Sequence, residues 1–436
     1  MTTFVTLVGV LELSSKYRYG ITSRGAPIYL FRPYDESMPE CIVGCSHRDT
    51  SRNQIALITV EPSGPKPRGT LIRLFGVVGD PIAEKEALLK HYCPFRPEGQ
   101  PQDPEEEPRQ DLDLEGWTTF HIDPPGCRDI DDAMSYHPEK GWAITIADVA
   151  SAVPEGSYID LTAKAIGATF YNLEGRVMCP MLPPAISEGT SSLLPGERRR
   201  GLTFFLSTET FGCTWVTVKH SFTYESFAGS PLTGSPLAGS PLVALTDEDP
   251  HAWIEKQMIR YNRAAAAVLK KAGAGILRVQ GSSEAKWAEI DPGLGAEAAK
   301  YEAVGDGEQT HASLGLYCHA SSPLRRYADL VNQRALKAIL TQKEAPMTDV
   351  EFLNMRAKAN RRWSRDLVFL THVTAGRVHE IDVVWLEDTR VWVPLWRRVI
   401  RLRHEEPREF GYRGRIRIFC DPTRRNWKQR ILTEKV

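Results

Sequence analysis

The sequence predicts an α+β protein in which a central domain of mixed strands and helices lies between two small β-barrels. Short strand-like runs occupy both ends of the chain, whereas the middle changes from alternating strand patterns to helical periodicity. The length of 436 residues also exceeds one ordinary hydrophobic core, so we expect several domains. The expected divisions are 1–93 for the first barrel, 94–116 for a linker, 117–372 for the central domain and 373–436 for the second barrel.

The N-terminal segment has the pattern of a small barrel. Short runs such as TLVGVLEL, APIYLF and QIALITV follow one another with turns between them, and a helix-like run, PIAEKEALLKHY, comes after the last strand. Many short strands with one helix are typical of an OB-type barrel. Residues 94–116 are Pro-rich and acidic, which predicts a linker because such a segment cannot bury enough apolar surface to fold alone.

The central domain contains a clear amphipathic helix within residues 251–271. Its apolar side chains recur at three- and four-residue steps, and Gly273 marks its end. The predicted core face consists of Trp253, Ile254, Met258, Tyr261, Ala265, Val268 and Leu269. Before this helix, GSPL occurs three times at a period too short for a repeat fold, which indicates a surface insertion.

The C-terminal segment, residues 373–436, is locally basic. It carries fifteen Lys and Arg against nine Asp and Glu, a net charge of +6, while the whole chain has a formal charge of −1. Arginines such as Arg415 alternate with rings such as Trp392, which predicts a surface for single-stranded nucleic acid. The alternative, with equal weight for any single ring, is that the tryptophans fill the core of the barrel.

Composition excludes several other classes of protein. Eight scattered cysteines lack the density of a disulfide scaffold, and the N-terminus lacks the features of a secretory signal. No apolar stretch reaches the roughly 18 residues that a membrane-spanning helix requires. We therefore expect an intracellular protein, cytoplasmic by default, with no membrane association.

Four carboxylates gather in the stretch HIDPPGCRDIDDAM. They are Asp123, Asp129, Asp131 and Asp132, and Pro124–Gly126 breaks regular structure between the first acid and the others. Four neighbouring carboxylates repel one another unless a cation neutralises them. Because all the ligands are oxygens, the sequence predicts Mg²⁺, with Mn²⁺ as the other candidate. The alternative is a solvated acidic loop.

A calcium-binding EF-hand loop does not fit the same residues. Counted from Asp129, Met134 falls where glycine is expected and Lys140 where a bidentate Glu is needed. A structural zinc site at Cys41, Cys45 and His47 is a lesser alternative, because an apolar strand with incidental cysteines explains that stretch better.

A second motif, YCHASSPLRRYADLVNQRALKAIL, predicts a helix that begins near a cluster of positive charge. Ser322 is the expected N-cap and Pro323 lies in the expected first turn. Arg325 and Arg326 would then lie at the positive end of the helix dipole, where an anion such as a phosphate is favoured. Ordinary surface arginines, or an ion pair with a neighbouring acid, are the alternatives.

These two motifs resemble the catalytic domain of the RNB family of ribonuclease II and ribonuclease R type exoribonucleases. A third motif, PMLPPAISEGTSSLLPGERR, resembles another segment of that family, and GVVGDPIAEKEALLKHY resembles the end of its cold-shock-like barrel. The resemblance covers residues 70–436. It implies a central RNB domain between a cold-shock-like and an S1-like barrel, and a processive, Mg²⁺-dependent 3′-to-5′ exoribonuclease that releases nucleoside 5′-monophosphates from single-stranded RNA.

The resemblance also implies roles for individual residues. All four acids are candidate metal ligands, Asp123 and Asp132 most directly, and Asp129 completes the acidic shell. Asp131 is assigned to the chemical step. Arg325 would hold the scissile phosphate, and Tyr171 would stack on the 3′-terminal base. The expected catalytic residues are thus Asp131, Arg325 and Asp129, and the expected RNA-binding residues are Tyr171, Arg325, Arg326, Trp392 and Arg415.

The sequence departs from the family pattern at several points. Tyr171 lies two residues further from the PMLP element than in the bacterial enzymes, and Ser364 stands where relatives often carry a Glu. The N-terminal region has room for one barrel where many relatives have two, so we expect RNA capture either to be weaker or to be delegated to a protein partner. A protein that keeps the fold for RNA binding or assembly without turnover is the alternative to an enzyme, and preference for RNA over DNA rests on the resemblance alone.

Overall fold

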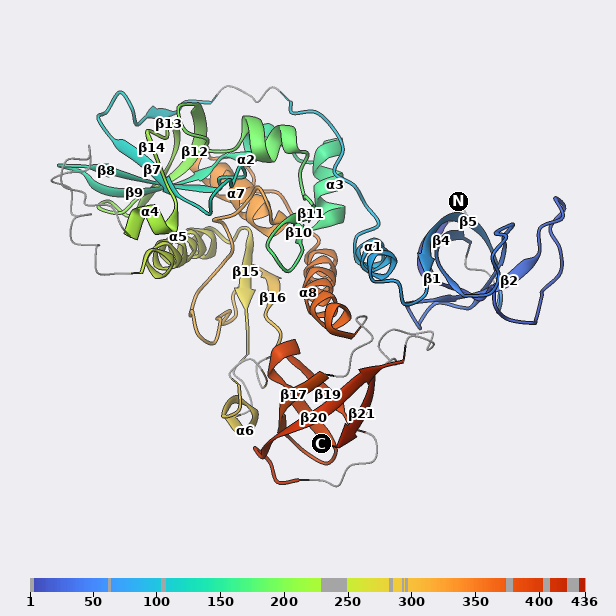
Figure 1. Cartoon of the computed structure of the whole chain (residues 1–436). Helices are drawn as coiled ribbons and strands as arrows, with labels where there is room; N and C mark the ends of the chain where they lie inside the picture. The colour runs from blue at the N-terminus through green and yellow to red at the C-terminus, as the bar shows by residue number, and fades with distance from the viewer. Residues whose placement is uncertain are drawn as a thin grey trace. The chain divides into compact units, whose positions relative to one another are not determined.

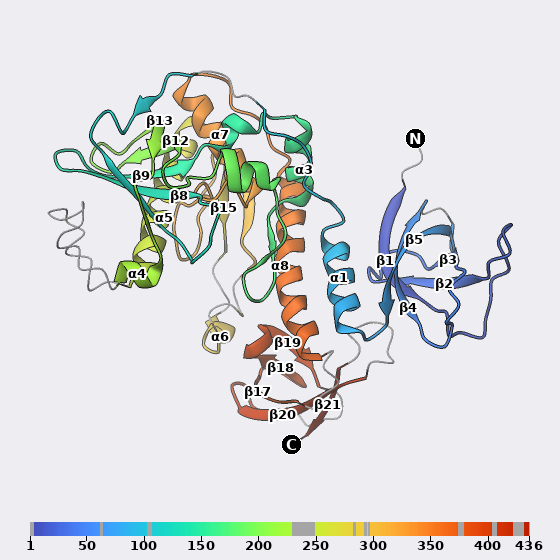
Figure 2. The ribbon, with the colours of Figure 1, turned by 45° about the horizontal axis from the view of Figure 1, so that its top comes forward.

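The computed structural model divides the chain into two compact units, which are described separately (Figures 1 and 2). Unit 1 comprises Met1–Phe95, Phe170–Met178 and Ala359–Val436, and unit 2 comprises Arg96–Thr169 and Cys179–Lys358. The GSPL repeat lies outside the described residues. The structure describes residues 4–61, 64–102, 107–228, 249–281, 285–291, 294, 297–373, 379–402, 408–421 and 431–435.

The N-terminal part of unit 1 is a closed five-stranded barrel of order β1-β2-β3-β5-β4, as the sequence predicts. Its strands are β1 (Val5–Leu11), β2 (Ile28–Pro33), β3 (Cys41–Gly44), β4 (Gln54–Val60) and β5 (Arg68–Val77). The helix α1 (Pro81–Tyr92) follows, and the Asp80 carboxylate caps it by accepting the N–H groups of Ile82 and Ala83. Cys41 and Cys45 lie buried in the apolar core of the barrel, which favours an apolar strand with incidental cysteines over the zinc alternative.

The C-terminal part of unit 1 is a five-stranded antiparallel sheet of order β19-β18-β17-β20-β21. Its strands are β17 (His379–Trp385), β18 (Arg390–Val393), β19 (Arg398–Arg401), β20 (Arg413–Cys420) and β21 (Ile431–Lys435). The long helix α8 (Val350–Val373) brings Asp366 to this sheet, where the carboxylate accepts hydrogen bonds from Arg398 on β19 and Tyr92 on α1. This buried contact joins the barrel helix, α8 and the sheet.

Unit 2 is built on a mixed seven-stranded sheet of order β14-β7-β8-β9-β12-β13-β6. The edge strands β14 and β6 run parallel to their neighbours, and the inner pairs are antiparallel. The expectation of a mixed sheet is therefore confirmed. The strands are β6 (Gln110–Asp111), β7 (Thr118–Ile122), β8 (Asp132–His137), β9 (Gly141–Ala147), β12 (Arg198–Phe205), β13 (Thr210–Thr217) and β14 (His220–Phe222).

One face of this sheet packs against α5 (Pro250–Ala272) and α7 (Tyr327–Leu340). Strand residues such as Phe120 and Ile146 meet Trp253 and Leu269 of α5 in one apolar cluster, which confirms the predicted core face of that helix. Gly273 ends α5 in the left-handed conformation (φ 65°), as predicted. Other short elements are α2 (Val149–Ala152), α3 (Tyr158–Ile166), β10 (Phe170–Tyr171), β11 (Val177–Cys179), η1 (Ile186–Thr190), α4 (Tyr224–Ala228), β15 (Ile276–Val279), α6 (Ala285–Ala288), β16 (Lys300–Ala303) and η3 (Pro394–Trp396).

The opposite face of the sheet carries buried hydroxyl groups among small apolar side chains. Thr119 and Ser135 are hydrogen-bonded across β7 and β8 at 2.8 Å. Further along, Thr203 on β12 bonds both Thr145 (2.8 Å) and Thr214 (2.7 Å). Alternation along each strand therefore separates an apolar face from a hydrogen-bonded polar face.

The predicted linker is too long at its C-terminal end. Residues 110–111 form β6 at the edge of the sheet, and the side chains of Arg109 and Leu112 are buried. The Pro-rich and acidic composition did not indicate that these residues pack against the sheet, because their packing depends on paired charges more than on apolar side chains.

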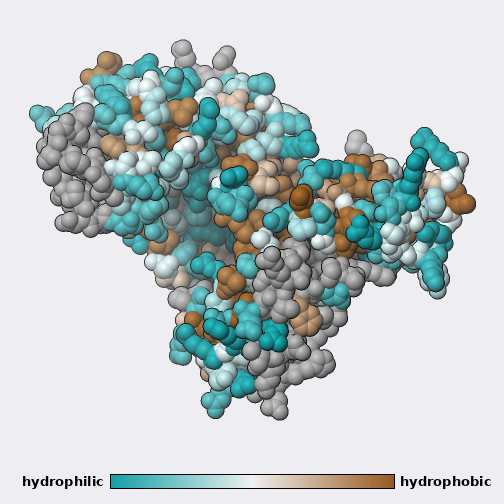
Figure 3. Space-filling model, viewed as in Figure 1, coloured by the Kyte–Doolittle hydropathy of each residue, from teal (hydrophilic) through white to brown (hydrophobic). Residues whose placement is uncertain are grey.

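The surface of the molecule is mainly hydrophilic on the face drawn in Figure 3, where brown apolar patches are small and separate. Many large apolar side chains are buried in the cores of the two units, whereas others, such as Leu114 and Met347, are exposed. Within the described residues, no helix combines the length and apolar character that crossing a membrane requires.

Candidate functional site

The Pro-Pro-Gly segment folds the acidic stretch back on itself. Asp123 directly follows β7, and Asp132 begins the neighbouring antiparallel strand β8. Between them the Cys127 N–H donates to the Pro124 carbonyl (3.1 Å), and Gly126 takes a left-handed φ of 79° that glycine accepts without strain. The first and last acids of the motif therefore lie at the facing ends of adjacent strands.

Asp131 is buried and meets the second motif directly. Its carboxylate accepts the backbone N–H of Leu324 (2.9 Å) and the Nε–H of Arg325 (3.1 Å). Burial raises the pKa of Asp131 to about 7, although the Arg325 charge and the Leu324 hydrogen bond lower it. The Arg325 side chain remains 45% exposed and also donates to the Ser322 hydroxyl (3.0 Å). The structure thus brings together two residues that the sequence assigned to catalysis.

The other three acids surround this pair with negative charge. Burial, Asp123 and Asp131 together raise the pKa of Asp132 well above its ordinary value. Asp123 bonds the Nδ1 of His121 (2.9 Å), and Asp129 accepts the Cys127 thiol (3.3 Å). Asp132 is therefore the acid whose ionisation is disfavoured by its acidic neighbours unless a positive partner is present.

No three His, Cys, Asp or Glu residues converge on one point in the part of the chain that the structure describes. The donor chemistry nevertheless fits a hard divalent cation, because every candidate ligand is a carboxylate oxygen and Asp132 is destabilised by its acidic neighbours. Asp123, Asp129, Asp131 and Asp132 are the residues that would hold it.

The start of α7 differs from the prediction. The helix begins at Tyr327, and Arg326 occupies the N-cap position without a side-chain cap. Ser322 instead begins a turn in which its carbonyl accepts the Arg326 N–H (3.0 Å), so its predicted N-cap role is wrong. The reason is tertiary: Arg326 is held extended by a bridge to Ala168, while Asp329 accepts the Ser322 N–H (2.8 Å).

Arg326 forms an ion pair with Asp329 (Nε to Oδ2, 2.9 Å), so the ion-pair alternative describes this arginine. Tyr171 lies on β10 in unit 1, half-buried, and its carbonyl accepts the indole N–H of Trp363 (2.8 Å). The four acids belong to unit 2. Ser364 is exposed on α8 and donates to the Asn360 carbonyl (3.3 Å).

The two residues predicted to bind RNA in the C-terminal sheet have different environments. Trp392 is only 6% exposed, and Trp385 and Trp396 are exposed even less. The face of the Trp392 ring is therefore not available to a base, and the expectation that it binds RNA is wrong. Its neighbours along β18 are buried as well, because both faces of this strand are covered. Arg415 is exposed on β20 and bonds Asp382 (2.8 Å).

Sequence reasoning missed two side chains beside the acids. His121 contacts Asp123 directly. Tyr224 begins α4 and stacks on His251 with ring centroids 3.6 Å apart; burial first, and then Asp123 and Asp132, raise its pKa to about 12. The sequence could have indicated His121, because it lies two residues before Asp123 on a predicted strand and alternation places both side chains on one face.

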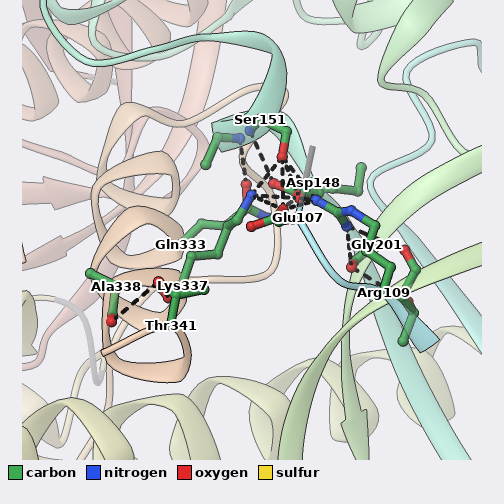
Figure 4. A network of polar contacts seen from close by, with 12 residues as sticks. Glu107, Arg109, Asp148, Ser151, Gly201, Gln333, Lys337, Ala338 and Thr341 are labelled. Atoms are coloured by element: carbon green, nitrogen blue, oxygen red, sulfur yellow. Dashed lines mark hydrogen bonds and ion pairs between the residues drawn. The ribbon is translucent and has the colours of Figure 1, made fainter. Parts of the chain in front are cut away.

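A buried charge network fixes the position of α7 (Figure 4). Asp148, whose side chain is fully buried, contacts Arg109 and, at 2.8 Å, Lys337 of α7. Glu107 contacts the same two cations. Burial alone would raise the pKa of Asp148, but Lys337 and Arg109 lower it to about 2. Gln333 of α7 adds a hydrogen bond to the Ala147 carbonyl (2.7 Å). The network therefore anchors the helix whose preceding turn carries Arg325.

Solved structures share this fold over nearly the whole chain. The apo form of Mycoplasma genitalium RNase R matches this chain with a TM-score of 0.70 at 16% sequence identity. The match covers 99% of this chain and 90% of that chain. Yeast Ssd1, described as a pseudonuclease, has a TM-score of 0.66 at 16% identity, covering 95% of this chain and 67% of that one.

Curated relatives match shorter stretches. The human 3′-5′ exoribonuclease HELZ2 is 40% identical over 100 residues, which is 22% of this chain and 3% of that protein. The human exosome complex exonuclease RRP44 is 28% identical over 209 residues, which is 43% of this chain and 22% of that protein. The chain thus spans less than a quarter of either relative. Residues 109–228 and 295–342 match the RNB domain family model, so this part of the chain is an RNB domain.

Proposed function

We propose that this protein is a 3′-to-5′ exoribonuclease that hydrolyses single-stranded RNA processively to nucleoside 5′-monophosphates. The observation that carries the proposal is the contact between buried Asp131 and half-exposed Arg325, which come from distant parts of the chain. A carboxylate fixed beside a guanidinium that still reaches solvent provides a site for a phosphodiester and a group for its chemistry. The exonuclease names of HELZ2 and RRP44 support the same reaction.

Each part of the site has a separate task in this proposal. The exposed end of Arg325 binds the scissile phosphate and stabilises the charge that develops on it. Asp131, held in place by the Leu324 N–H and the Arg325 guanidinium, is the carboxylate positioned to act in the chemical step. Asp123, Asp129 and Asp132, together with Asp131, would hold Mg²⁺ or Mn²⁺, and a bound cation supplies Lewis-acid stabilisation of the phosphoryl oxygens.

The solved complexes of Mycoplasma genitalium RNase R with single-stranded and double-stranded RNA support RNA as the substrate. A protein partner for RNA delivery is part of the proposal, since RRP44 is named as a component of the exosome complex. We also propose an intracellular location. The eight cysteines, scattered along the sequence without the density of a disulfide scaffold, are compatible with a reducing compartment.

A second candidate function is RNA binding without turnover, because Ssd1 combines a similar fold with the description of a pseudonuclease. The four acids of the motif and Arg325 favour hydrolysis over this alternative, since RNA binding alone does not require a cluster of repelling carboxylates.

The test is incubation of the full chain with 5′-labelled single-stranded RNA and Mg²⁺, followed by gel analysis of shortened products. We expect a ladder that EDTA abolishes and that Asp131→Asn reduces by about 10²- to 10⁴-fold, while RNA affinity by fluorescence anisotropy stays near native. Glu139→Gln, at an exposed carboxylate in the turn between β8 and β9, is the matched control and should leave the ladder unchanged. No ladder from the native chain, or equal ladders from Asp131→Asn, would contradict the enzyme. A matched DNA strand tests sugar preference.

A further inference from the structure

His121 lies on the strand that leads into the acidic loop, and its ring contacts the first acid. The Nδ1 atom is 2.9 Å from Oδ2 of Asp123, and the imidazole is 6% exposed. The neighbours Phe120 and Ile122 point into the apolar cluster on the helix-covered face of the sheet. Strand alternation therefore places His121 and Asp123 together on the opposite face.

The environment of the ring indicates which nitrogen carries the proton. The Nε2 atom of His121 is buried and has no hydrogen-bond partner among the described residues. A buried N–H without an acceptor is costly, whereas the Nδ1–H tautomer directs its proton to Asp123 and leaves only a lone pair at Nε2. The carboxylate of Asp123 is thus the one side-chain hydrogen-bond partner of this ring within the described part of the chain.

Asp123 needs such a donor to remain in the site. The acid is followed by the exposed Pro124–Gly126 turn, and its side chain is still 20% exposed, so rotation toward water is open to it. Asp132 lies close enough to be destabilised by Asp123 when both are ionised, which favours that rotation. A fixed hydrogen bond to one oxygen opposes it.

We propose that His121 is a positioning residue that fixes the Asp123 carboxylate through Oδ2 and so leaves Oδ1 to bind the divalent cation. The inference rests on the metal site of the proposed function. Hydrogen-bond donors behind ligating carboxylates orient them, and losing such a donor weakens metal binding by about 10- to 100-fold. The effect should therefore appear in metal affinity, apart from any change in RNA cleavage.

The experiment measures Mn²⁺ affinity of the full chain by electron paramagnetic resonance of free Mn²⁺, without RNA. We expect His121→Ala to weaken binding at the native site by about tenfold or more. His121→Asn should stay within about threefold of native, because its amide nitrogen occupies nearly the place of Nδ1. His121→Gln should resemble His121→Ala, since its amide nitrogen lies nearer the place of Nε2. Asp132→Asn identifies which bound Mn²⁺ belongs to this site.

Thr119→Val is the matched structural control. Thr119 lies two residues earlier on the same face of β7, is fully buried and bonds Ser135, so its loss should lower the melting temperature but not the Mn²⁺ affinity. In an exonuclease assay, His121→Ala should require more Mn²⁺ for half-maximal rate and approach the native rate at saturation.

The outcomes separate the two proposals. If the native chain binds Mn²⁺ and cleaves RNA but His121→Ala binds Mn²⁺ equally well, the positioning role is wrong and the proposed function stands. Equal affinities for the Asn and Gln variants would also overturn it. If the native chain binds no Mn²⁺, the metal site of the proposed function is wrong and the role of His121 falls with it.

Discussion

Replacing Asp148 with Asn should destabilise unit 2 substantially. Asp148 and Glu107 together neutralise two buried cations, Arg109 and Lys337, and the substitution leaves both cations with a single acid. The pKa of Asp148 is lowered from 3.8 to about 2, which corresponds to about 2.5 kcal/mol because each pKa unit is worth about 1.4 kcal/mol. Its side chain is fully buried, so solvent does not screen the pair. Breaking a buried ion pair costs about 3–5 kcal/mol in general, so we expect a loss of about 2–4 kcal/mol.

Urea unfolding followed by tryptophan fluorescence measures this change, since Trp215 lies beside the network with the Arg109 guanidinium 5.8 Å from its ring. Because the folded-state pKa is depressed, the stabilisation is present above pH 4 and is lost as the pH falls from about 4 to about 2. The difference between native and Asp148→Asn should therefore be full at pH 7 and smaller at pH 3.

Asp111→Asn is the control, because its ion pair with Arg198 is partly exposed and should contribute less than about 1 kcal/mol. A free energy of unfolding for Asp148→Asn within about 0.5 kcal/mol of native, which is the range typical of surface substitutions, would refute the reasoning. A difference that does not shrink between pH 7 and pH 3 would refute the electrostatic part.

Two further predictions concern the aromatic rings of the C-terminal sheet and the close packing at Gly167. Trp392→Phe should lower the melting temperature but leave the affinity for single-stranded RNA near native, because the Trp392 ring lies in the core. Tyr412→Ala removes a ring that is 45% exposed and should weaken the affinity for single-stranded RNA by about 1 kcal/mol. Filter binding measures the RNA affinity of both variants. A loss of affinity in the Trp392 variant alone would show that Trp392, and not Tyr412, contacts RNA. Gly167→Ala should cost about 2 kcal/mol, because φ is 84° and a Cβ would lie 2.5 Å from Cβ of Arg356. Gly156→Ala has a similar φ but open space around it, so thermal unfolding should show a loss of only about 1 kcal/mol, and equal losses would contradict the predicted clash.

The elements that the sequence predicts correctly are those with local causes. The strands of the N-terminal barrel alternate with turn residues, and α5 has helical periodicity together with Gly273 at its end. The acidic loop also has a local cause, because Pro124–Gly126 forbids regular structure and returns the chain beside Asp123. Such features depend on neighbours within a few residues, so one sequence is enough to predict them.

The incorrect predictions involve partners that are distant in the sequence. Ser322 has the chemistry of an N-cap, but the bridge from Arg326 to Ala168 delays the helix to Tyr327. Trp392 alternates with arginines as a binding ring would, yet both faces of its strand are covered. Arg109 lies in an acidic segment, and only the fold supplies Asp148 as its buried partner.

The contact between Asp131 and the residues just before α7 has a consequence for biosynthesis. The Asp131 carboxylate and the Leu324 N–H are 193 positions apart in the chain. A ribosome therefore releases all four acids long before it makes Arg325, and loop closure of this length must await most of the central domain. The contact between Asp131 and Arg325, on which the proposed function depends, is accordingly completed only late in synthesis, after most of the central domain has been translated.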